Sequence, residues 1–359
     1  EISGSEQQEI YDINPDLVLL CGGTDGGNKE VIIANAKHLV AIDRPFTTIV
    51  AGNKSANDDI KAIFDEAGKD VVITANVMPQ FNKLNIEPAR DAIRQLFISR
   101  IIEAKGLNIL QSMTSYKIIP TPLAVLHACE LLSKGTKTQQ GRGDLLAVDI
   151  GGATTDVYSM ASGEPTVDNT MLKGLPEPWM KRTVEGDLGM RYSLTHVFEQ
   201  IPGADNSENE YMQQVKAWVE LCTARPDTLA APGSEEEKLE EFLGRSAVSM
   251  AVERHCGRIA DVFTPLGLMH TQEGKDLMNV PSVIGIGGVL RNSRRPEEIL
   301  KGSLYDFMHP ECTKPRKPKF YLDQKYIFAS MGLLRSINPE LAFELLDKET
   351  VEIGCNATV

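Results

Sequence analysis

The stretch LAVDIGGATTDVYSM, residues 146–160, decides the fold of the second half of the chain. Val148 and Ile150 alternate with other side chains before two glycines, and Val157 belongs to a second apolar segment after them. Apolar alternation on both sides of a short glycine turn is typical of two strands joined as a hairpin. The stretch therefore predicts a β-hairpin whose turn carries glycines and polar groups.

The turn of this hairpin has the residue types that a phosphate chain needs. Gly151 and Gly152 allow a sharp bend and expose consecutive backbone N–H groups, since no side chain blocks an anion. Thr154 and Thr155 add hydroxyl donors. Asp149 can orient a water on Mg²⁺, because nucleotide-bound Mg²⁺ keeps several waters and takes one or two carboxylates. A plain β-turn is the alternative, but the combination in one hairpin favours phosphate.

A second glycine motif lies well over a hundred residues further along the chain. The segment SVIGIGGVLRN, residues 282–292, is a buried strand pattern that runs into Gly285, Gly287 and Gly288. A flat ring can lie against bare backbone there, and the Arg291 guanidinium can stack on it. Glycine loops after strands are common as structural turns. The binding interpretation of this motif is therefore supported only by its position after the hairpin at 146–160.

Residues 1–110 predict an α/β region. Three apolar strand patterns, near 14–20, 46–53 and 70–77, are each followed by a helical pattern. Strands that alternate with helices form a mostly parallel sheet covered on both faces. The first strand runs into the glycine-rich loop CGGTDGGNKE, for which anion binding at a helix start and ordinary turn geometry are equally good interpretations.

Two further regions follow. Residues 111–145 predict a connecting strand, a helix from Pro122 and a polar loop, and residues 146–359 predict a second lobe. In that lobe, residues 232–263 predict one long helix, with Ser234 and Glu237 at the spacing of a capping box.

Composition excludes several functional classes. The 359 residues, 42% of them hydrophobic, suffice for two or three soluble units. A formal net charge of −13 argues against nucleic-acid binding, which needs clustered lysines and arginines. We find no bilayer-length apolar run and no leader, so we expect no membrane association and a cytoplasmic location. Six scattered cysteines predict reduced thiols rather than a disulfide framework or a zinc site.

The motifs together resemble a known superfamily. LLAVDIGGATTDVYS resembles the second phosphate loop of the actin, sugar-kinase and heat-shock-chaperone ATPases, and VIGIGGVLRN resembles their adenosine loop. PTPLAVLHACELL and YIFASMGLL resemble their two connecting helices. With NPDLVLLCGGTDGGNKEVIIANA, they resemble over essentially the whole chain the MutL (GlmL) family, which is encoded alongside adenosylcobalamin-dependent glutamate mutase.

The resemblance implies an actin-like (ribonuclease H-like) ATPase with ATP and Mg²⁺ between two lobes. Residues 1–110 would then be the remainder of the first lobe, an inserted Rossmann-like domain, or both. It implies that Asp149 is catalytic and positions Mg²⁺ through a water. It places Gly151, Gly152 and Thr154 on the phosphates and the glycine pair at 287–288 beneath adenosine.

The resemblance also suggests secondary site residues. The segment TVEGDLGMR, 183–191, corresponds to a glycine and acid segment near the phosphates, which makes Glu185 and Asp187 candidates, Asp187 as a catalytic group. Glu253 corresponds to a ribose contact. Exposed surface carboxylates are the alternative interpretation for all three.

The sequence departs from the superfamily pattern in three places. Ala153 replaces a third glycine, and Val289 replaces a serine after the adenosine glycines. We do not find the first phosphate loop, an Asp-x-Gly-Ser/Thr hairpin. Because the chain starts at Glu1 without a methionine, we expect that loop to lie in a missing amino-terminal segment and this chain alone to hydrolyse ATP weakly or not at all.

The resemblance implies a function as an ATP-dependent reactivating factor. Such a chaperone would use ATP to release damaged cobalamin from a glutamate mutase or a related aminomutase. A small-molecule kinase of the same fold is one alternative, with Asp187 as a possible base, and an actin-like scaffold protein is another. An iron–sulfur activase is disfavoured because we see no suitable cysteine pair.

Overall fold

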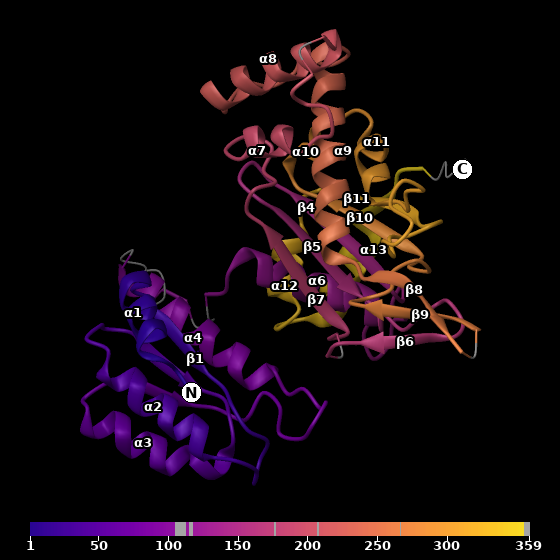
Figure 1. The fold of residues 1–359 in the computed structure, drawn as a ribbon. Coiled ribbons are helices and arrows are strands. Elements are labelled where there is room, and N and C mark those ends of the chain that lie inside the picture. The colour runs from indigo at the N-terminus through magenta and orange to yellow at the C-terminus, as the bar shows by residue number, and fades with distance from the viewer. Residues whose placement is uncertain (105–112, 115–117, 176, 207, 266, 355–359) are drawn as a thin grey trace. The chain divides into compact units, whose positions relative to one another are not determined.

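The chain forms two compact units, Glu1–Ile119 and Pro120–Val359 (Figure 1). The computed structural model describes residues 1–104, 113–114, 118–175, 177–206, 208–265 and 267–354. The division falls inside the predicted connecting segment 111–145, part of which lies outside the described residues. The helix that we predicted within that segment packs in the core of the second unit.

The first unit is a parallel α/β layer, which confirms the class predicted for residues 1–110. Its three strands run parallel in the order β1-β2-β3. Apolar side chains of α2 and α3 form one core with those of β1 and β2. The elements are α1 (Gly4–Ile13), β1 (Leu17–Leu20), α2 (Glu30–Ala41), β2 (Thr47–Val50), α3 (Asn57–Glu66), β3 (Val71–Ile73) and α4 (Glu87–Ala104).

Two asparagines at the carboxyl ends of these strands close the glycine-rich loop. The Asn53 Oδ1 accepts the N–H of Gly26 at 3.0 Å, and its Nδ2 donates to the carbonyl of Gly27 at 3.0 Å. The Asn76 Nδ2 donates to the carbonyl of Gly23 at 3.0 Å. Because side chains of the protein already use these polar groups, the geometry favours the turn interpretation of the loop.

The second unit is built on a six-stranded mixed sheet in the order β12-β11-β10-β4-β5-β7. β5 is antiparallel to β4 and to β7, and β12 is antiparallel to β11, whereas β10 is parallel to both β4 and β11. Three antiparallel strands followed by parallel ones give the strand order of a ribonuclease H-like sheet, which confirms the predicted fold class. The strands are β4 (Leu145–Ile150), β5 (Thr155–Met160), β7 (Met180–Glu185), β10 (Ser282–Ile286), β11 (Lys319–Asp323) and β12 (Thr350–Glu352).

Helices and a small second sheet complete this unit. The helices are α6 (Thr121–Lys134), α7 (Leu194–Glu199), α8 (Glu210–Ala224), α9 (Glu235–His255), α10 (Gly288–Asn292), α11 (Pro296–Leu300), α12 (Phe328–Leu334) and α13 (Pro339–Glu349). The small sheet has the order β6-β9-β8, from β6 (Thr170–Lys173), β8 (Arg258–Thr264) and β9 (Gly267–Glu273). In the described residues no helix has the length and apolar character that crossing a membrane requires.

Alternation along β4 assigns its side chains to two cores. Leu146, Val148 and Ile150 join the core that α9 covers, whereas Leu145 and Ala147 join the core of α6, α12 and α13. By the same alternation the next position, Asp149, turns toward α6 and α12 while Ile150 turns toward α9. The end of β4 thus supplies residues to both faces of the sheet.

The prediction of one helix over residues 232–263 is wrong at its carboxyl end. α9 stops at His255 and the chain continues as strand β8 from Arg258. The N–H of Gly257 donates to the carbonyl of Lys275 at 2.6 Å, so this turn is held by a distant segment, an effect that helical periodicity does not reveal. At the other end Ser234 Oγ accepts the N–H of Glu237 at 3.3 Å, but the Glu237 carboxylate accepts from Gly233 N at 2.6 Å, so half of the predicted capping box forms.

Helices α6 and α12 touch through their backbones. A Cβ atom built on Gly332 of α12 would lie 1.8 Å from the carbonyl oxygen of Ala124 in α6. Contacts that short do not occur between real atoms, so only glycine permits this crossing.

We predict that Gly332→Ala lowers the free energy of unfolding by about 2 kcal/mol or more, because the new methyl group forces the helices apart. Urea denaturation measures the change. Gly244→Ala is the matched control, since a Cβ at this glycine in α9 would meet only the Ile299 side chain, at 3.3 Å. Equal stability of the two variants would contradict the close crossing.

A lysine is fully buried beneath β5. The Lys275 Nζ donates to Ser159 Oγ at 3.1 Å and to the Trp179 carbonyl at 2.7 Å. His255 Nε2 also lies 2.8 Å from Ser159 Oγ. Burial, assisted by the Lys181 charge, lowers the pKa of Lys275 to about 7.

This lysine makes stability depend on pH. Between pH 7 and about 10.5 the unfolded chain holds a proton that the folded protein has released, so folding becomes more favourable as pH rises. We predict that wild type gains stability relative to Lys275→Met by about 1 kcal/mol per pH unit above pH 7. Thermal melts at several pH values measure this difference, with Lys173→Met, whose lysine is 72% exposed, as control. A difference independent of pH would contradict a buried, neutralised lysine.

Candidate functional site

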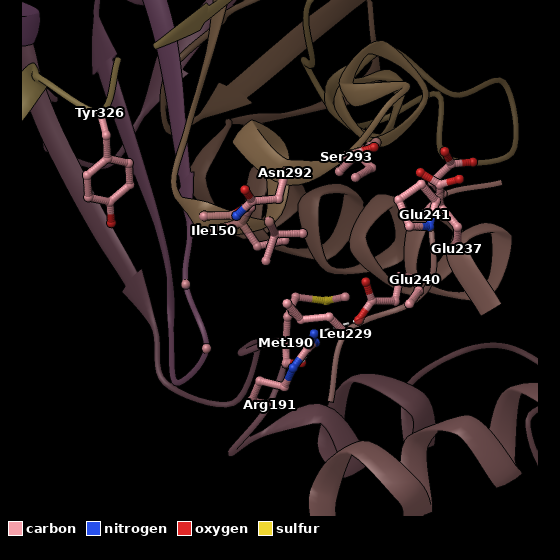
Figure 2. Close-up of a pocket in the computed structure, with 17 residues that line it drawn as sticks. Ile150, Met190, Arg191, Leu229, Glu237, Glu240, Glu241, Asn292, Ser293 and Tyr326 are labelled. Carbon is pink, nitrogen blue, oxygen red and sulfur yellow. Dashed lines mark hydrogen bonds and ion pairs between the residues drawn. The ribbon is translucent and has the colours of Figure 1, made fainter. Parts of the chain in front are cut away.

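A cavity of about 660 Å³ opens in the second unit beside the end of β4 (Figure 2). Gly151 and Gly152 from the predicted phosphate turn line it together with Gly288 from the predicted adenosine loop. The structure therefore brings together two motifs that are more than 130 residues apart. This volume is within the range of pockets that enclose small ligands.

The phosphate turn is held in place by the segment that follows β7. The Gly151 N–H closes the turn on the carbonyl of Thr154 at 2.9 Å. The carbonyl of Gly151 accepts from Met190 N at 3.0 Å, and that of Gly152 accepts from Arg191 N at 2.8 Å. The turn thus keeps a fixed shape.

The two threonines have different surroundings. The Thr154 hydroxyl is partly exposed and lies 3.5 Å from Asp156 Oδ2. The Thr155 hydroxyl is fully buried and donates to the carbonyl of Leu188. Thr155 therefore faces the protein interior and stabilises the base of the turn, whereas Thr154 remains accessible.

The adenosine loop touches the end of β4 directly. Gly287 has a φ of +101°, and a Cβ there would lie 2.4 Å from the Ile150 carbonyl oxygen and 2.8 Å from Asp149 Oδ1. Gly288 follows as the first residue of α10 and leaves open space toward the cavity. Only glycine fits at position 287, both for its backbone angle and for its neighbours.

Two other predicted residues of this loop lie elsewhere. Gly285 is buried within β10, where a Cβ would lie 2.9 Å from Leu290 Cδ1, so its small size serves packing under the loop. Arg291 is exposed and does not line the cavity, although its charge offsets part of the rise that burial causes in the pKa of Asp323. Asn292, one residue later, lines the cavity instead.

The Asp149 carboxylate is the unusual group of the site. It faces a small hollow of about 20 Å³, room for about one water molecule, which Asp323 and Tyr326 also line. In the part of the chain that the structure describes, no hydrogen bond or ion pair reaches this carboxylate. Burial raises the pKa of Asp149 to about 6, and the charges of Asp156 and Asp323 act in the same direction.

The neighbouring carboxylate of Asp323 caps helix α12. It accepts the N–H groups of Ile327 at 2.9 Å and of Phe328 at 3.1 Å, and burial raises its pKa. Tyr326, which directly precedes Ile327, has a left-handed φ of 58°. Its side chain lines both the small hollow and the large cavity (Figure 2). Among the described residues, no three His, Cys, Asp or Glu side chains gather as a metal cluster. A cation here would have one or two carboxylate ligands and otherwise waters, as Mg²⁺ on a nucleotide does.

The secondary acidic candidates are held in ion pairs. Arg254 contacts Glu185 at 2.7 Å and both carboxylate oxygens of Asp187 at 2.8 and 2.9 Å. These hydrogen bonds hold the pKa of Asp187 well below its ordinary value, which makes it a poor proton acceptor. Glu253 pairs with Arg258 at 3.1 Å.

Sequence reasoning missed the far wall of the cavity. Glu237, Glu240 and Glu241 of α9 line it, as do Arg191 and Leu229 (Figure 2). The capping pattern assigned Glu237 to the helix start, and no motif gave Glu240 or Glu241 a role. In the sequence, one feature separates Glu240 and Glu241 from an ordinary solvated helix face: two carboxylates stand next to each other more than one turn into α9.

We predict that Asp149→Asn stabilises the protein without ligand at pH 7.5 by about 1–3 kcal/mol, because it removes a buried, unpaired charge. The folded pKa lies above that of the unfolded chain, so the wild-type penalty appears as pH rises from about 4 through 6. Thermal melts at pH 4 and 7.5 test this. An equal shift at both values would contradict the raised pKa.

Known proteins resemble this chain over most of its length. The profile of the family described as MutL protein matches residues 1–350. A protein named Protein MutL from Clostridium tetanomorphum is 45% identical over 356 residues, which are 98% of this chain and 77% of that protein. A solved structure, ethanolamine utilization protein EutJ from Carboxydothermus hydrogenoformans, shares 11% identity over 85% of this chain and 71% of its own. Its TM-score of 0.22 is too low for the match to support an argument.

Proposed function

Because this chain belongs to the MutL protein family, we propose that it is an ATP-dependent reactivating factor for a cobalamin-dependent mutase of the glutamate mutase type, acting in the cytoplasm. One observation carries the nucleotide part of this proposal. The glycines of the phosphate turn and of the adenosine loop line one cavity, next to a carboxylate that has no partner among the described residues. The mutase as partner rests on the family resemblance.

Each part of the site has a role in nucleotide binding. The Gly151 N–H is used within the turn, so the open backbone at Gly152 is the part that suits phosphate oxygens, and Gly288 leaves room for the nucleoside. Asp149 suits a water of Mg²⁺. When bound, Mg²⁺ neutralises phosphate charge and orients the triphosphate.

ATP hydrolysis fits the chemistry better than phosphoryl transfer to a metabolite. A kinase would need a base, and the predicted candidate, Asp187, is bound to Arg254 through two hydrogen bonds. A chaperone instead converts a change at the phosphates into a change of affinity for its partner. Release of damaged cobalamin from an inactivated mutase is the step that such a change would drive.

We predict that Gly152→Val and Gly288→Val each weaken MgATP binding by about tenfold or more, because a side chain would fill the ligand space while the fold tolerates it. A Cβ on Gly152 meets only the Arg191 side chain, at 3.6 Å, and one on Gly288 meets only Asn292, at 3.8 Å. Titration calorimetry measures the affinity. Gly4→Val, also at the first position of a helix with open space, is the control. Unchanged affinity in both site variants would place ATP elsewhere.

The partner is tested with inactivated glutamate mutase, free adenosylcobalamin and MgATP. We expect a form of the protein that hydrolyses ATP to restore mutase activity and its Gly152→Val variant to restore much less. Phosphate transfer to a metabolite would favour the kinase alternative, and nucleotide-dependent sedimentation would favour the scaffold. No recovery with a form that hydrolyses ATP would remove the mutase from the proposal.

A further inference from the structure

Arg191 connects parts of the cavity that are distant in sequence. Its backbone N–H donates to the carbonyl of Gly152 in the phosphate turn at 2.8 Å. Its side chain, only 14% exposed, extends along the cavity wall toward α9. One residue thus has its main chain on the phosphate turn and its guanidinium on the opposite wall.

The guanidinium binds the loop that joins α8 to α9. Its Nε donates to the carbonyl of Pro226 at 3.1 Å and its Nη2 to that of Thr228 at 3.0 Å. The same Nη2 donates to Glu240 Oε1 on α9 at 2.6 Å. A planar guanidinium reaches these acceptors at once, whereas an ammonium group is a single point of contact.

The loop that Arg191 holds presents an apolar side chain to the cavity. Leu229 is 75% exposed and lines the cavity beside Met190 and Glu240 (Figure 2). Leaving a leucine in water costs free energy that a covering flat ring would recover. Residues 226–230 lie between helices, so their position depends on such side-chain contacts.

Building on the proposed function, we infer that Arg191 is a positioning residue that fixes residues 226–230, with Leu229, as the nucleoside-side wall of the ATP site. It sets the separation of this wall from the phosphate turn. Its loss should therefore weaken binding of the nucleoside part and leave binding of the phosphate part nearly intact.

The test compares three probes on the whole chain: MgATP, adenosine and magnesium tripolyphosphate. We expect Arg191→Lys to raise the Kd of adenosine and of MgATP by about tenfold, and that of tripolyphosphate by less than about threefold. Arg142→Lys is the matched control, because this arginine, like Arg191, binds one carboxylate together with main-chain carbonyls, here on Asp347 and Thr350. It should lower thermal stability similarly without changing any Kd.

A second variant protects the test against misfolding. Leu229→Ala removes an exposed side chain, so we expect an unchanged melting temperature and a weaker affinity for adenosine. Wild-type affinity for adenosine in both Arg191→Lys and Leu229→Ala would overturn the inference and leave ATP binding standing. If the wild-type chain binds none of the three probes, the proposed function fails as well.

Discussion

The contact between Gly287 and the end of β4 is the constraint on which the site depends. β10 pairs with β4 in parallel register, with Gly285 beside Val148 and Ile286 beside Asp149. Gly287, the first residue after β10, therefore lies against the Ile150 carbonyl oxygen, from which a Cβ would be 2.4 Å away. A glycine at this place lets both loops leave the sheet side by side. A register shift of one residue would separate them and exchange the side chains of β10 between the two cores that cover the sheet.

The same geometry brings buried carboxylates close together, which costs electrostatic free energy. Asp149, Asp156 and Asp323 lie close enough that the charges of the other two raise the pKa of Asp149. Arg182 offsets part of this negative charge, because its Nη2 lies 2.7 Å from Asp156 Oδ1. Asp149 itself has no partner among the described residues. A protein that needed only stability would hold a neutral side chain there. Unpaired buried charge is instead expected where a ligand supplies the missing cation, since functional sites are where local rules are broken.

The sequence contained the elements of this site but not all of its contacts. Glycine spacing and apolar alternation predicted the hairpin, the glycine loop after β10 and the sheet class, because these are local properties of strands and turns. The pairing of Arg191 with Glu240 and the capping of α12 by Asp323 join residues from different elements, so no local pattern contains them. The end of α9 was missed for the same reason. The helical pattern continues past His255, and a contact with a distant segment ends the helix.

The division of β4 between two faces explains how one site can communicate with the helices below the sheet. The phosphate turn opens toward α9, whereas Asp149 points toward α6 and α12 and shares its hollow with Asp323. Asp323 holds the first amides of α12, and α12 meets α6 at Gly332 with backbone against backbone. Packed helices without an intervening side chain cannot absorb a small shift by changing rotamers, so they move together or not at all. If the protein acts as proposed, a change of charge beside Asp149 acts on α12 and α6 as a pair, and α6 begins where the second unit begins.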